Sequence, residues 1–503
     1  MGQNRSTAFK LSPSWCLFLG VTLVYLAFAK PIILGIDGND MLAVAKSLVQ
    51  DGNFTINHTA AQPFGALGRE GQYYSSRYPL LPILVTPFVA FGLFLDHRFN
   101  LPDEFVLPNF TATFAIAFSV LITAGISVLT MLLARRLGAQ SWGAYLAGLA
   151  TAFGTTLLVY GRQFYADPLL TLVTAAGVYV SLGHTNKELR WASVFAGLAV
   201  TVKPTGIVLG PVLAFYFVLK KVSWRTALQP LLGTLCGLLI HLGYNYLRFG
   251  DWLQFGQNAS RFTFDGWLDR ANALLFSPGA SAGLLWYCPP VLLAIAGAWQ
   301  IRKSKPLEVG LIMGVFVGYW GLHSFWSFGQ WNWGPRFLLP VLPGLLALGS
   351  VLRRQGQKWL ILLTLVGFLV NGPTLLSFFV RYQYEVAAVG NYQALALWGD
   401  WRQAPVFNIW QTTYRQVTGI PILVTDQYRL EQRQKLEKRL GALPSVDVWP
   451  TPLMYTIPVW WWTLLPLIGI SPWLGLAFAI ALLGFGLWLL RLGWMRTGMR
   501  ERT

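Results

Sequence analysis

Charged side chains are scarce in this sequence, because Asp, Glu, Lys and Arg together account for only 12% of its 503 residues. An ordinary soluble domain has about twice that share. Hydrophobic residues account for 54% and fall into continuous runs. Each run is about 15–25 residues long and edged by Trp, Tyr, Arg and Lys, as in helices that span a lipid core. The runs do not alternate, which excludes a transmembrane barrel. The sequence therefore predicts an all-α polytopic membrane protein.

Cysteine and histidine are also rare, with three and five residues respectively. The cysteines Cys16, Cys236 and Cys288 lie in apolar segments without paired spacing, which argues against a disulfide framework or a zinc site. A phosphate-cradling Gly-x-x-x-x-Gly-Lys loop is absent from the sequence, so a nucleotide site is not supported. The net charge is +18, but the basic residues are spread among short loops. Nucleic acid is therefore not an expected partner.

The apolar runs give twelve expected spans when the amino terminus is placed in the cytoplasm. They are residues 14–36, 109–134, 142–160, 168–183, 190–203, 205–219, 226–247, 281–301, 306–323, 337–352, 358–378 and 472–490. With this assignment the basic short loops all fall on the cytoplasmic side, where Lys and Arg are normally enriched. The chain then divides into a transmembrane module over 1–378, an outer extramembrane segment over 379–471 with a charged helix at 427–440, and a last span with a cytoplasmic tail over 472–503.

Two pieces of the first outer loop are apolar without fitting as spans. Residues 40–50 place their apolar side chains largely on one helical face, and Gly52 suits the end of that helix. Residues 79–95 are apolar and interrupted by proline, but counting them as a span would invert the charge pattern that follows. We therefore expect both pieces to be amphipathic helices that lie against the outer surface of the membrane.

Carboxylates stand at the expected outer ends of two spans, where they can be partly desolvated and still meet a polar substrate. Asp37 follows the first span and is the candidate general base. Asp167 follows the third span and faces the same compartment, and Asp40 shares about one helical face with Asp37. The alternative for Asp40 and Asp167 is that each caps a helix, with Pro168 at the first helical position in the second case.

Cations on the outer side run against the usual enrichment of Lys and Arg in the cytoplasm, so each requires a reason. Arg77, Lys203 and Arg336 are such residues. A bound phosphate would supply the reason, since Arg can hold phosphate oxygens with two hydrogen bonds and Lys acts as a point charge. Arg162, one turn before Asp167, is a further candidate for substrate binding. The alternative is a lipid headgroup contact or an ion pair with a nearby Asp.

Aromatic residues crowd the same outer face. Most of them fit an interfacial belt, which needs no further function. Trp331 and Trp333, close to Arg336, could instead stack on a sugar or flank a lipid chain. Tyr74, in the segment that holds Arg77, is a further candidate for substrate binding.

Six stretches, in this order along the chain, resemble the GT-C superfamily of membrane glycosyltransferases, in particular bacterial relatives of protein O-mannosyltransferases and lipid A aminoarabinose transferases. They are Asp37 with Ala45-Lys46-Ser47-Leu48-Val49 and Asp51-Gly52; Gly71-Gln72-Tyr73-Tyr74-Ser75-Ser76-Arg77-Tyr78-Pro79; Asp167-Pro168-Leu169; Tyr244-Asn245-Tyr246-Leu247-Arg248-Phe249-Gly250; Ser277-Pro278-Gly279 with Gly283-Leu284; and Gly334-Pro335-Arg336-Phe337-Leu338-Leu339-Pro340. The resemblance covers most of residues 14–350 and implies a GT-C-like helical bundle. The family often has Asp-Glu where this chain has Asp37-Gly38, and Lys where it has Arg77.

The resemblance implies a polyprenyl-phosphate sugar as donor and an inverting transfer to a hydroxyl acceptor on the outer side, with Asp37 as base and Arg77 near the donor phosphate. The acceptor, an envelope glycan, lipid or protein, is left open, and so is a divalent cation. The expected location is a bacterial inner membrane with the site facing the periplasm, where membrane lipids are further partners. The alternatives are a transporter or flippase of lipid-linked saccharides, a glycan polymerase or ligase, and a non-catalytic scaffold.

Overall fold

The computed structural model describes residues 11–57, 65–101, 107–257, 261–327, 329, 331–423 and 452–499. Within these residues most of the chain is helical, and its only strands, β1 (Ala66–Leu67) and β2 (Tyr73–Tyr74), form a short antiparallel pair. The all-α prediction is confirmed. The charged helix expected at 427–440 lies outside the described residues.

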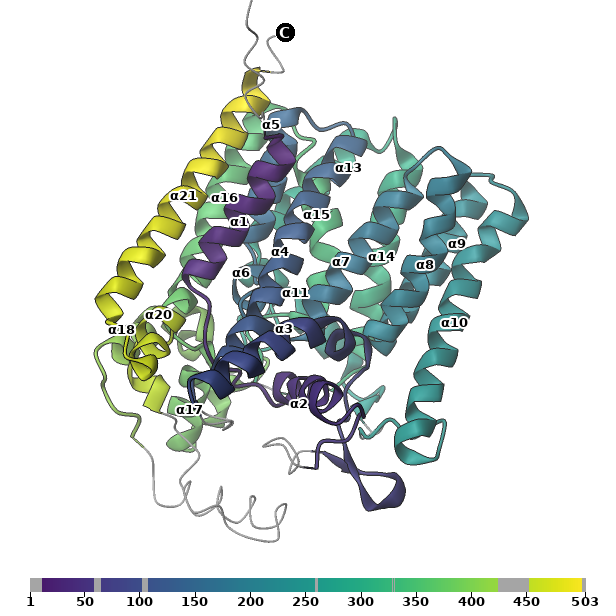
Figure 1. The fold of residues 1–503 in the computed structure, drawn as a ribbon. Coiled ribbons are helices and arrows are strands. Elements are labelled where there is room, and N and C mark those ends of the chain that lie inside the picture. The colour runs from purple at the N-terminus through teal and green to yellow at the C-terminus, as the bar shows by residue number, and fades with distance from the viewer. Residues whose placement is uncertain are drawn as a thin grey trace, which may run out of the picture.

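A bundle of helices that run in one general direction forms the body of the molecule (Figure 1). Its members are α1 (Pro13–Ala27), α4 (Phe110–Arg136), α5 (Ser141–Phe153), α7 (Ala166–Ser181), α8 (Asn186–Val202), α9 (Leu209–Leu219), α10 (Trp224–Phe249), α13 (Leu293–Ile301), α14 (Pro306–Ser324), α15 (Leu342–Gly349), α16 (Arg354–Asn371) and α21 (Pro472–Met499). Further helices and 3-10 turns connect them: α2 (Ile36–Gln50), η2 (Arg69–Gly71), α3 (Leu80–Arg98), α6 (Leu157–Tyr160), η3 (Pro204–Val208), α11 (Trp267–Phe276), α12 (Leu284–Tyr287), η5 (Pro289–Leu292), η6 (Arg336–Val341), η7 (Gly372–Leu375), α17 (Phe379–Ala388), η8 (Tyr392–Leu395), η9 (Trp401–Gln403), α18 (Pro405–Val417), η10 (Pro452–Tyr455), α20 (Trp460–Thr463) and η11 (Leu465–Ile468).

Many of these helices are apolar enough to face lipid. Among the described residues, six are long and apolar enough to cross a membrane by length and composition: α3, α4, α10, α14, α16 extended to Leu375, and α21. Shorter apolar helical stretches are Pro13–Ala27, Ala166–Ser181, Pro204–Leu219, Pro289–Ile301 and Arg336–Gly349. A polytopic helical membrane protein is thereby confirmed, while the number of twelve spans stays a prediction.

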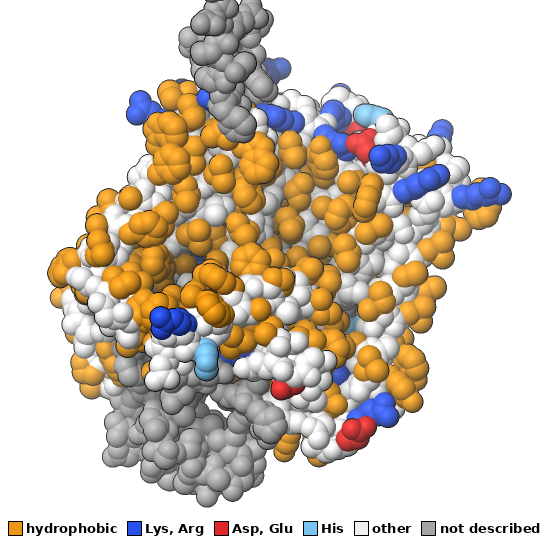
Figure 2. All heavy atoms as spheres, viewed as in Figure 1, with side chains coloured by type: hydrophobic (Ala, Val, Ile, Leu, Met, Phe, Trp, Pro, Cys, Tyr) orange, Lys and Arg blue, Asp and Glu red, His pale blue; other side chains and the backbone are white. Residues whose placement is uncertain are grey.

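The bundle has a basic end and an opposite end, which we call the outer end after its expected side. α1 begins and α21 ends at the basic end (Figure 1), and Figure 2 shows Lys and Arg side chains gathered along that edge. Arg135 and Arg136 occupy the last turn of α4. This distribution is the one expected if the basic end faces the cytoplasm.

The first helix is shorter than the expected span. α1 ends at Ala27, and residues 28–35 run without helix until α2 begins. Asp37 therefore lies in the first turn of α2 and not at the end of a membrane helix. α2 ends before Gly52, as expected, but its residues 38–47 are all buried. Protein, including α3, covers this helix more completely than a helix lying on lipid would be covered.

The apolar residues 79–95 form the greater part of α3, which contains Pro87. Figure 1 shows α3 running crosswise to the long helices at the outer end of the bundle. It packs against α2 and α4. The crosswise course agrees with a helix along the membrane surface, even though its length and composition alone would suit a span.

α8 and α10 approach each other very closely because small residues face each other where they cross. A β-carbon added to Gly233 would lie 1.9 Å from the carbonyl oxygen of Ser193. Small residues four positions apart on each of two membrane helices allow such an approach. The crossing is lined by Ser193 and Gly197 on α8 and by Gly233 and Gly237 on α10. It fixes the relative position of two residues at the outer end, Lys203 directly after α8 and Arg248 in the last turn of α10.

We expect Gly233→Leu to push α8 and α10 apart and to lower the unfolding temperature of the purified protein, since overpacking costs about 1–3 kcal/mol or more. Gly243→Leu is the matched control on the same helix, because a β-carbon there meets no atom within 4 Å. Thermal unfolding in detergent measures both. Equal losses in the two variants would contradict the close crossing.

We expect the two ends of the bundle to lie on opposite sides of the membrane. In a background without the three cysteines, single cysteines at Asn53 and Thr418, which are exposed near the outer end, should react with an impermeant thiol reagent added from outside. A cysteine at Gln355, exposed in the first turn of α16 at the basic end, should react only after the membrane is made permeable. Labelling of all three from outside would refute the assigned topology.

Candidate active site

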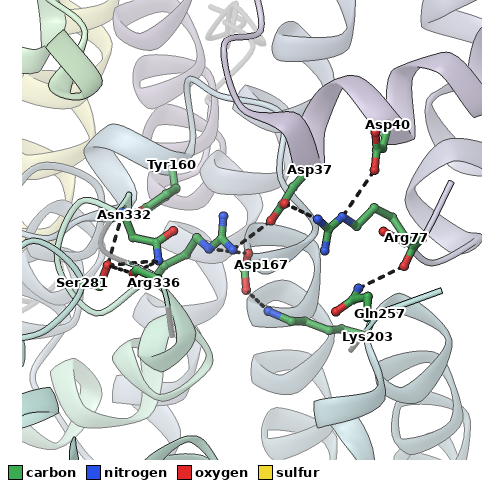
Figure 3. A network of polar contacts seen from close by, with 12 residues as sticks. Asp37, Asp40, Arg77, Tyr160, Asp167, Lys203, Gln257, Ser281, Asn332 and Arg336 are labelled. Atoms are coloured by element: carbon green, nitrogen blue, oxygen red, sulfur yellow. Dashed lines mark hydrogen bonds and ion pairs between the residues drawn. The ribbon is translucent and has the colours of Figure 1, made fainter. Parts of the chain in front are cut away.

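Six side chains that the sequence singles out meet at the outer end and form one chain of ion pairs with alternating charge (Figure 3). Its order is Asp40, Arg77, Asp37, Arg336, Asp167 and Lys203. We call these six residues the ionic network. Its shortest contacts join Arg77 to Asp37 and Lys203 to Asp167, each at 2.6 Å. Arg336 bridges the two halves, at 2.9 Å from Asp37 and 3.4 Å from Asp167.

Asp37 is the most accessible carboxylate of the network, with 26% of its side chain exposed against 5% for Asp167 and 0% for Asp40. Burial alone would raise the pKa of Asp37, but the charges of Arg77 and Arg336 outweigh burial and lower that pKa below its ordinary value. Asp37 is therefore ionised at neutral pH. Its contribution to the free energy of unfolding is present above the ordinary carboxyl pKa and is lost as pH falls through the lowered one.

None of the three carboxylates caps a helix, although two of them lie in a first helical turn. Asp37 is in the first turn of α2 and Asp167 in the first turn of α7, and no side chain caps either helix. Asp40 is an interior residue of α2. The capping alternative is thus wrong for Asp40 and Asp167, because the helices begin earlier than expected, at Ile36 and Ala166. Both amino termini carry partial positive charge close to the network, which favours anions there.

The segment before α7 packs directly against the start of α2. A β-carbon added to Gly38 would lie 2.4 Å from the backbone oxygen of Phe164, and one on Gly35 would lie 2.2 Å from the hydroxyl of Tyr165. Glycine at these positions therefore allows α2 to approach residues 164–165. This approach brings Asp37 within reach of the cation that Asp167 also contacts.

Each cation of the network stands at the end of an element. Lys203 follows α8, Arg336 begins η6, and Arg77 comes three residues before α3. Every one of them contacts a carboxylate, as the ion-pair alternative expects. The lipid headgroup alternative is less suited to Lys203 and Arg336, whose side chains are only 11% and 10% exposed.

Buried aromatic residues support Arg336. Its guanidinium lies 4.7 Å from the centre of the Tyr165 ring. Trp333 is fully buried, its backbone N–H donates to the hydroxyl of Tyr160 at 2.8 Å, and its indole N–H donates to Asn371 Oδ1 at 2.8 Å. Trp333, predicted to contact substrate, thus lies in the hydrophobic core, three residues before Arg336.

Three further candidates lie outside the ionic network. Arg162 is buried and donates to the backbone oxygens of Phe28 and Leu158 and to the hydroxyl of Thr374. Tyr74 belongs to β2, with its ring 6.1 Å from that of Phe249. Trp331 is 42% exposed and lies 5.0 Å from the ring of Tyr384. Their predicted roles in substrate binding stay predictions.

Sequence reasoning missed two residues that shape the site. Tyr165 lies under Arg336, and only its position two residues before Asp167 hinted at this. Arg248 contacts the backbone next to Arg77. Arg248 stands at the outer end of α10, so it is one more outer-side cation that requires a compensating partner.

A metal centre is not evident among the described residues, which contain no group of three or more His, Cys, Asp or Glu side chains able to hold an ion. The three carboxylates of the network each contact a cationic side chain instead. A divalent cation at this place would have to compete with those side chains.

Comparison with protein families gives one match. A family model described as dolichyl-phosphate-mannose-protein mannosyltransferase matches residues 105–244, which is less than half of the chain. The matched stretch includes Asp167 and Lys203. It supports the resemblance to membrane glycosyltransferases of the GT-C kind that the sequence indicated. No curated protein sequence matches the chain significantly.

Comparison with solved structures gives distant likenesses. ArnT from Cupriavidus metallidurans bound to undecaprenyl phosphate is 18% identical, with a TM-score of 0.46, covering 94% of this chain and 76% of that one. Apo ArnT from the same organism is 18% identical, with a TM-score of 0.48 and coverages of 93% and 76%. The Archaeoglobus fulgidus oligosaccharyltransferase in complex with Zn and sulfate is 11% identical, with a TM-score of 0.46 and coverages of 76% and 57%.

We expect Asp167→Asn to destabilise the protein by about 3–5 kcal/mol, since it removes one partner of a buried ion pair, and Lys203→Met to destabilise it less, because Asp167 keeps its contact with Arg336. The double variant should lose less than the sum of the two, because neither charge is then left unpaired. Thermal unfolding of the three variants measures this coupling. Strictly additive losses would show that the 2.6 Å contact does not couple the two residues.

Proposed function

We propose that this chain is an inverting glycosyltransferase that moves a sugar from a polyprenyl-phosphate donor to a hydroxyl acceptor. The observation that carries the proposal is Asp37, an accessible carboxylate held between Arg77 and Arg336 at the outer end of an apolar helical bundle. The mannosyltransferase family match over residues 105–244 supports the same class of reaction.

The charges of the network suit a phosphate-bearing donor. Arg77, Arg336 and Lys203 bring three positive charges together, and two helix amino termini add to them. Arginine can hold two phosphate oxygens at once. A phosphate that leaves from a sugar gains negative charge in the transition state, and fixed cations at that place stabilise it.

The proposed reaction is a single displacement. Asp37 accepts the proton of the acceptor hydroxyl while the hydroxyl oxygen attacks the anomeric carbon of the sugar. The bond from that carbon to the phosphate oxygen breaks, and its electron pair leaves on the phosphate. Configuration inverts because the attack occurs on the opposite face and no covalent glycosyl-enzyme forms.

Donor binding would also make Asp37 a better base. With both arginines beside it, the pKa of Asp37 is low, and a carboxylate of low pKa takes up protons poorly. The donor phosphate competes with Asp37 for Arg77 and Arg336, and it thereby weakens the two ion pairs of Asp37. The pKa of Asp37 then rises, and its basicity increases only when a donor is in place.

The position of the network suits a lipid-linked donor. Arg77 comes three residues before α3, which lies crosswise at the outer end (Figure 1) and is apolar enough for contact with lipid. A phosphate at Arg77 can therefore carry a prenyl chain that remains in the bilayer. We place the site on the periplasmic side of a bacterial inner membrane, with an envelope glycan, lipid or protein as acceptor.

We expect Asp37→Asn to lower the turnover number about 100-fold or more, because the amide keeps the shape of the side chain but cannot accept the proton. Asp269→Asn, in the first turn of α11 and exposed, is the matched control and should retain full turnover. Transfer of radiolabelled sugar from a polyprenyl-phosphate donor in membranes measures both. Wild-type turnover of Asp37→Asn would end the assignment of Asp37 as base.

A further inference from the structure

The guanidinium of Arg248 donates hydrogen bonds to the backbone of the segment that carries Arg77. Arg248 stands in the last turn of α10 and is only 1% exposed. Its Nη1 donates to the backbone oxygens of Ser75 and Arg77, the latter at 3.2 Å. Its Nη2 donates to Asn245 Oδ1 at 2.8 Å, and its Nε donates to the backbone oxygen of Tyr244 at 3.3 Å.

Gln257 binds the backbone of Ser76, the residue between Ser75 and Arg77. Its side-chain amide donates to the backbone oxygen of Ser76 at 3.0 Å and lies 3.5 Å from the hydroxyl of Tyr78. Figure 3 shows Gln257 next to the segment that carries Arg77. Three consecutive carbonyl groups, from residue 75 to residue 77, are therefore each fixed by a side chain from α10 or from the loop after it.

We propose that Arg248 is a positioning residue that holds Arg77 in place for the phosphate of the donor, an inference that rests on the proposed function. Arg77 is attached to a short connection between β2 and α3, which has few backbone hydrogen bonds of its own. Its guanidinium must nevertheless reach Asp37 and the donor phosphate together. Because the three carbonyl groups are fixed, the backbone of this segment cannot move freely, and the guanidinium of Arg77 keeps one position.

Arg248 acts through Arg77 and not as a phosphate ligand itself. All three of its guanidinium nitrogens already donate to protein oxygens. The rings of Tyr244 and Phe249, with centres 3.9 Å and 4.7 Å from the guanidinium carbon, cover it further. A planar fork with several donors is needed to hold two carbonyl groups at once, and lysine lacks that shape.

A double-mutant cycle on donor binding tests the proposal. We measure equilibrium binding of polyprenyl phosphate, without sugar, to the purified full chain in phosphatidylcholine nanodiscs. Arg77→Met and Arg248→Met should each lower the affinity about tenfold or more, the scale of a lost charge-assisted hydrogen bond. The double variant should bind no more weakly than Arg77→Met alone, because Arg248 then has nothing to position.

Arg270→Met is the matched control. Arg270 also braces a loop through backbone oxygens, those of Thr263, Asp265 and Ser324, and its loss should leave donor affinity unchanged. If Arg248→Met fails to fold, Gln257→Leu takes its place in the cycle, with a smaller expected loss that also vanishes in the Arg77→Met background.

Two outcomes overturn the proposal while the proposed function stands. Losses that add in the double variant would make Arg248 a direct contact of the phosphate, and wild-type affinity of Arg248→Met would reduce it to a structural brace. Absence of polyprenyl-phosphate binding by the wild-type chain would instead refute the proposed function, and the role of Arg248 with it.

Discussion

The double contact of Arg336 with Asp37 and Asp167 is the interaction on which the site depends. Both carboxylates are largely enclosed, and burying a charge without a partner is very costly. Arg336 joins the Asp37 pair on α2 to the Asp167 pair on α7, and it does so where Gly35 and Gly38 already let α2 pack against residues 164–165. The rings of Tyr165 and Phe337, with centres 4.7 Å and 5.1 Å from the guanidinium carbon, pack against Arg336.

The alternation of positive and negative charge lets the ionic network be stable when buried and still able to bind a phosphate. Three cations close together would repel one another, and three buried carboxylates would do the same. Interleaved, they form a neutral arrangement in which each charge is compensated by its neighbours. The same cations can exchange a carboxylate partner for a phosphate, since the two groups bind guanidinium in similar geometry. Stability and the proposed chemistry thus use the same residues.

Much of the site could be predicted from topology, and the reason is physical. A cation on the outer side or a carboxylate at a helix end is unfavourable unless something compensates it, so Asp37, Arg77, Asp167, Lys203 and Arg336 stand out in a sequence with few charges. The pairing itself could not be predicted, because Asp37 and Arg336 are 299 positions apart. Expectations from the sequence were also wrong where tertiary packing determines whether a side chain is buried or where a helix ends. Nothing near residue 333 shows that Trp333 faces the core, and the early end of α1 at Ala27 is not marked by the apolar run, which continues to Ile36.

The close approach at Gly38 has a consequence for how related chains are recognised. A side chain at position 38 would collide with the backbone of Phe164, so this chain cannot carry a second carboxylate directly after Asp37 without moving α2 away from α7. The acidic doublet common in the superfamily that the sequence resembles is therefore replaced here by a close contact of Gly38 with the backbone of Phe164. A search that requires the doublet would discard chains built in this way. An aspartate followed by glycine, together with a distant Phe-Tyr-Ala-Asp stretch, is the signature that this geometry would leave in an alignment.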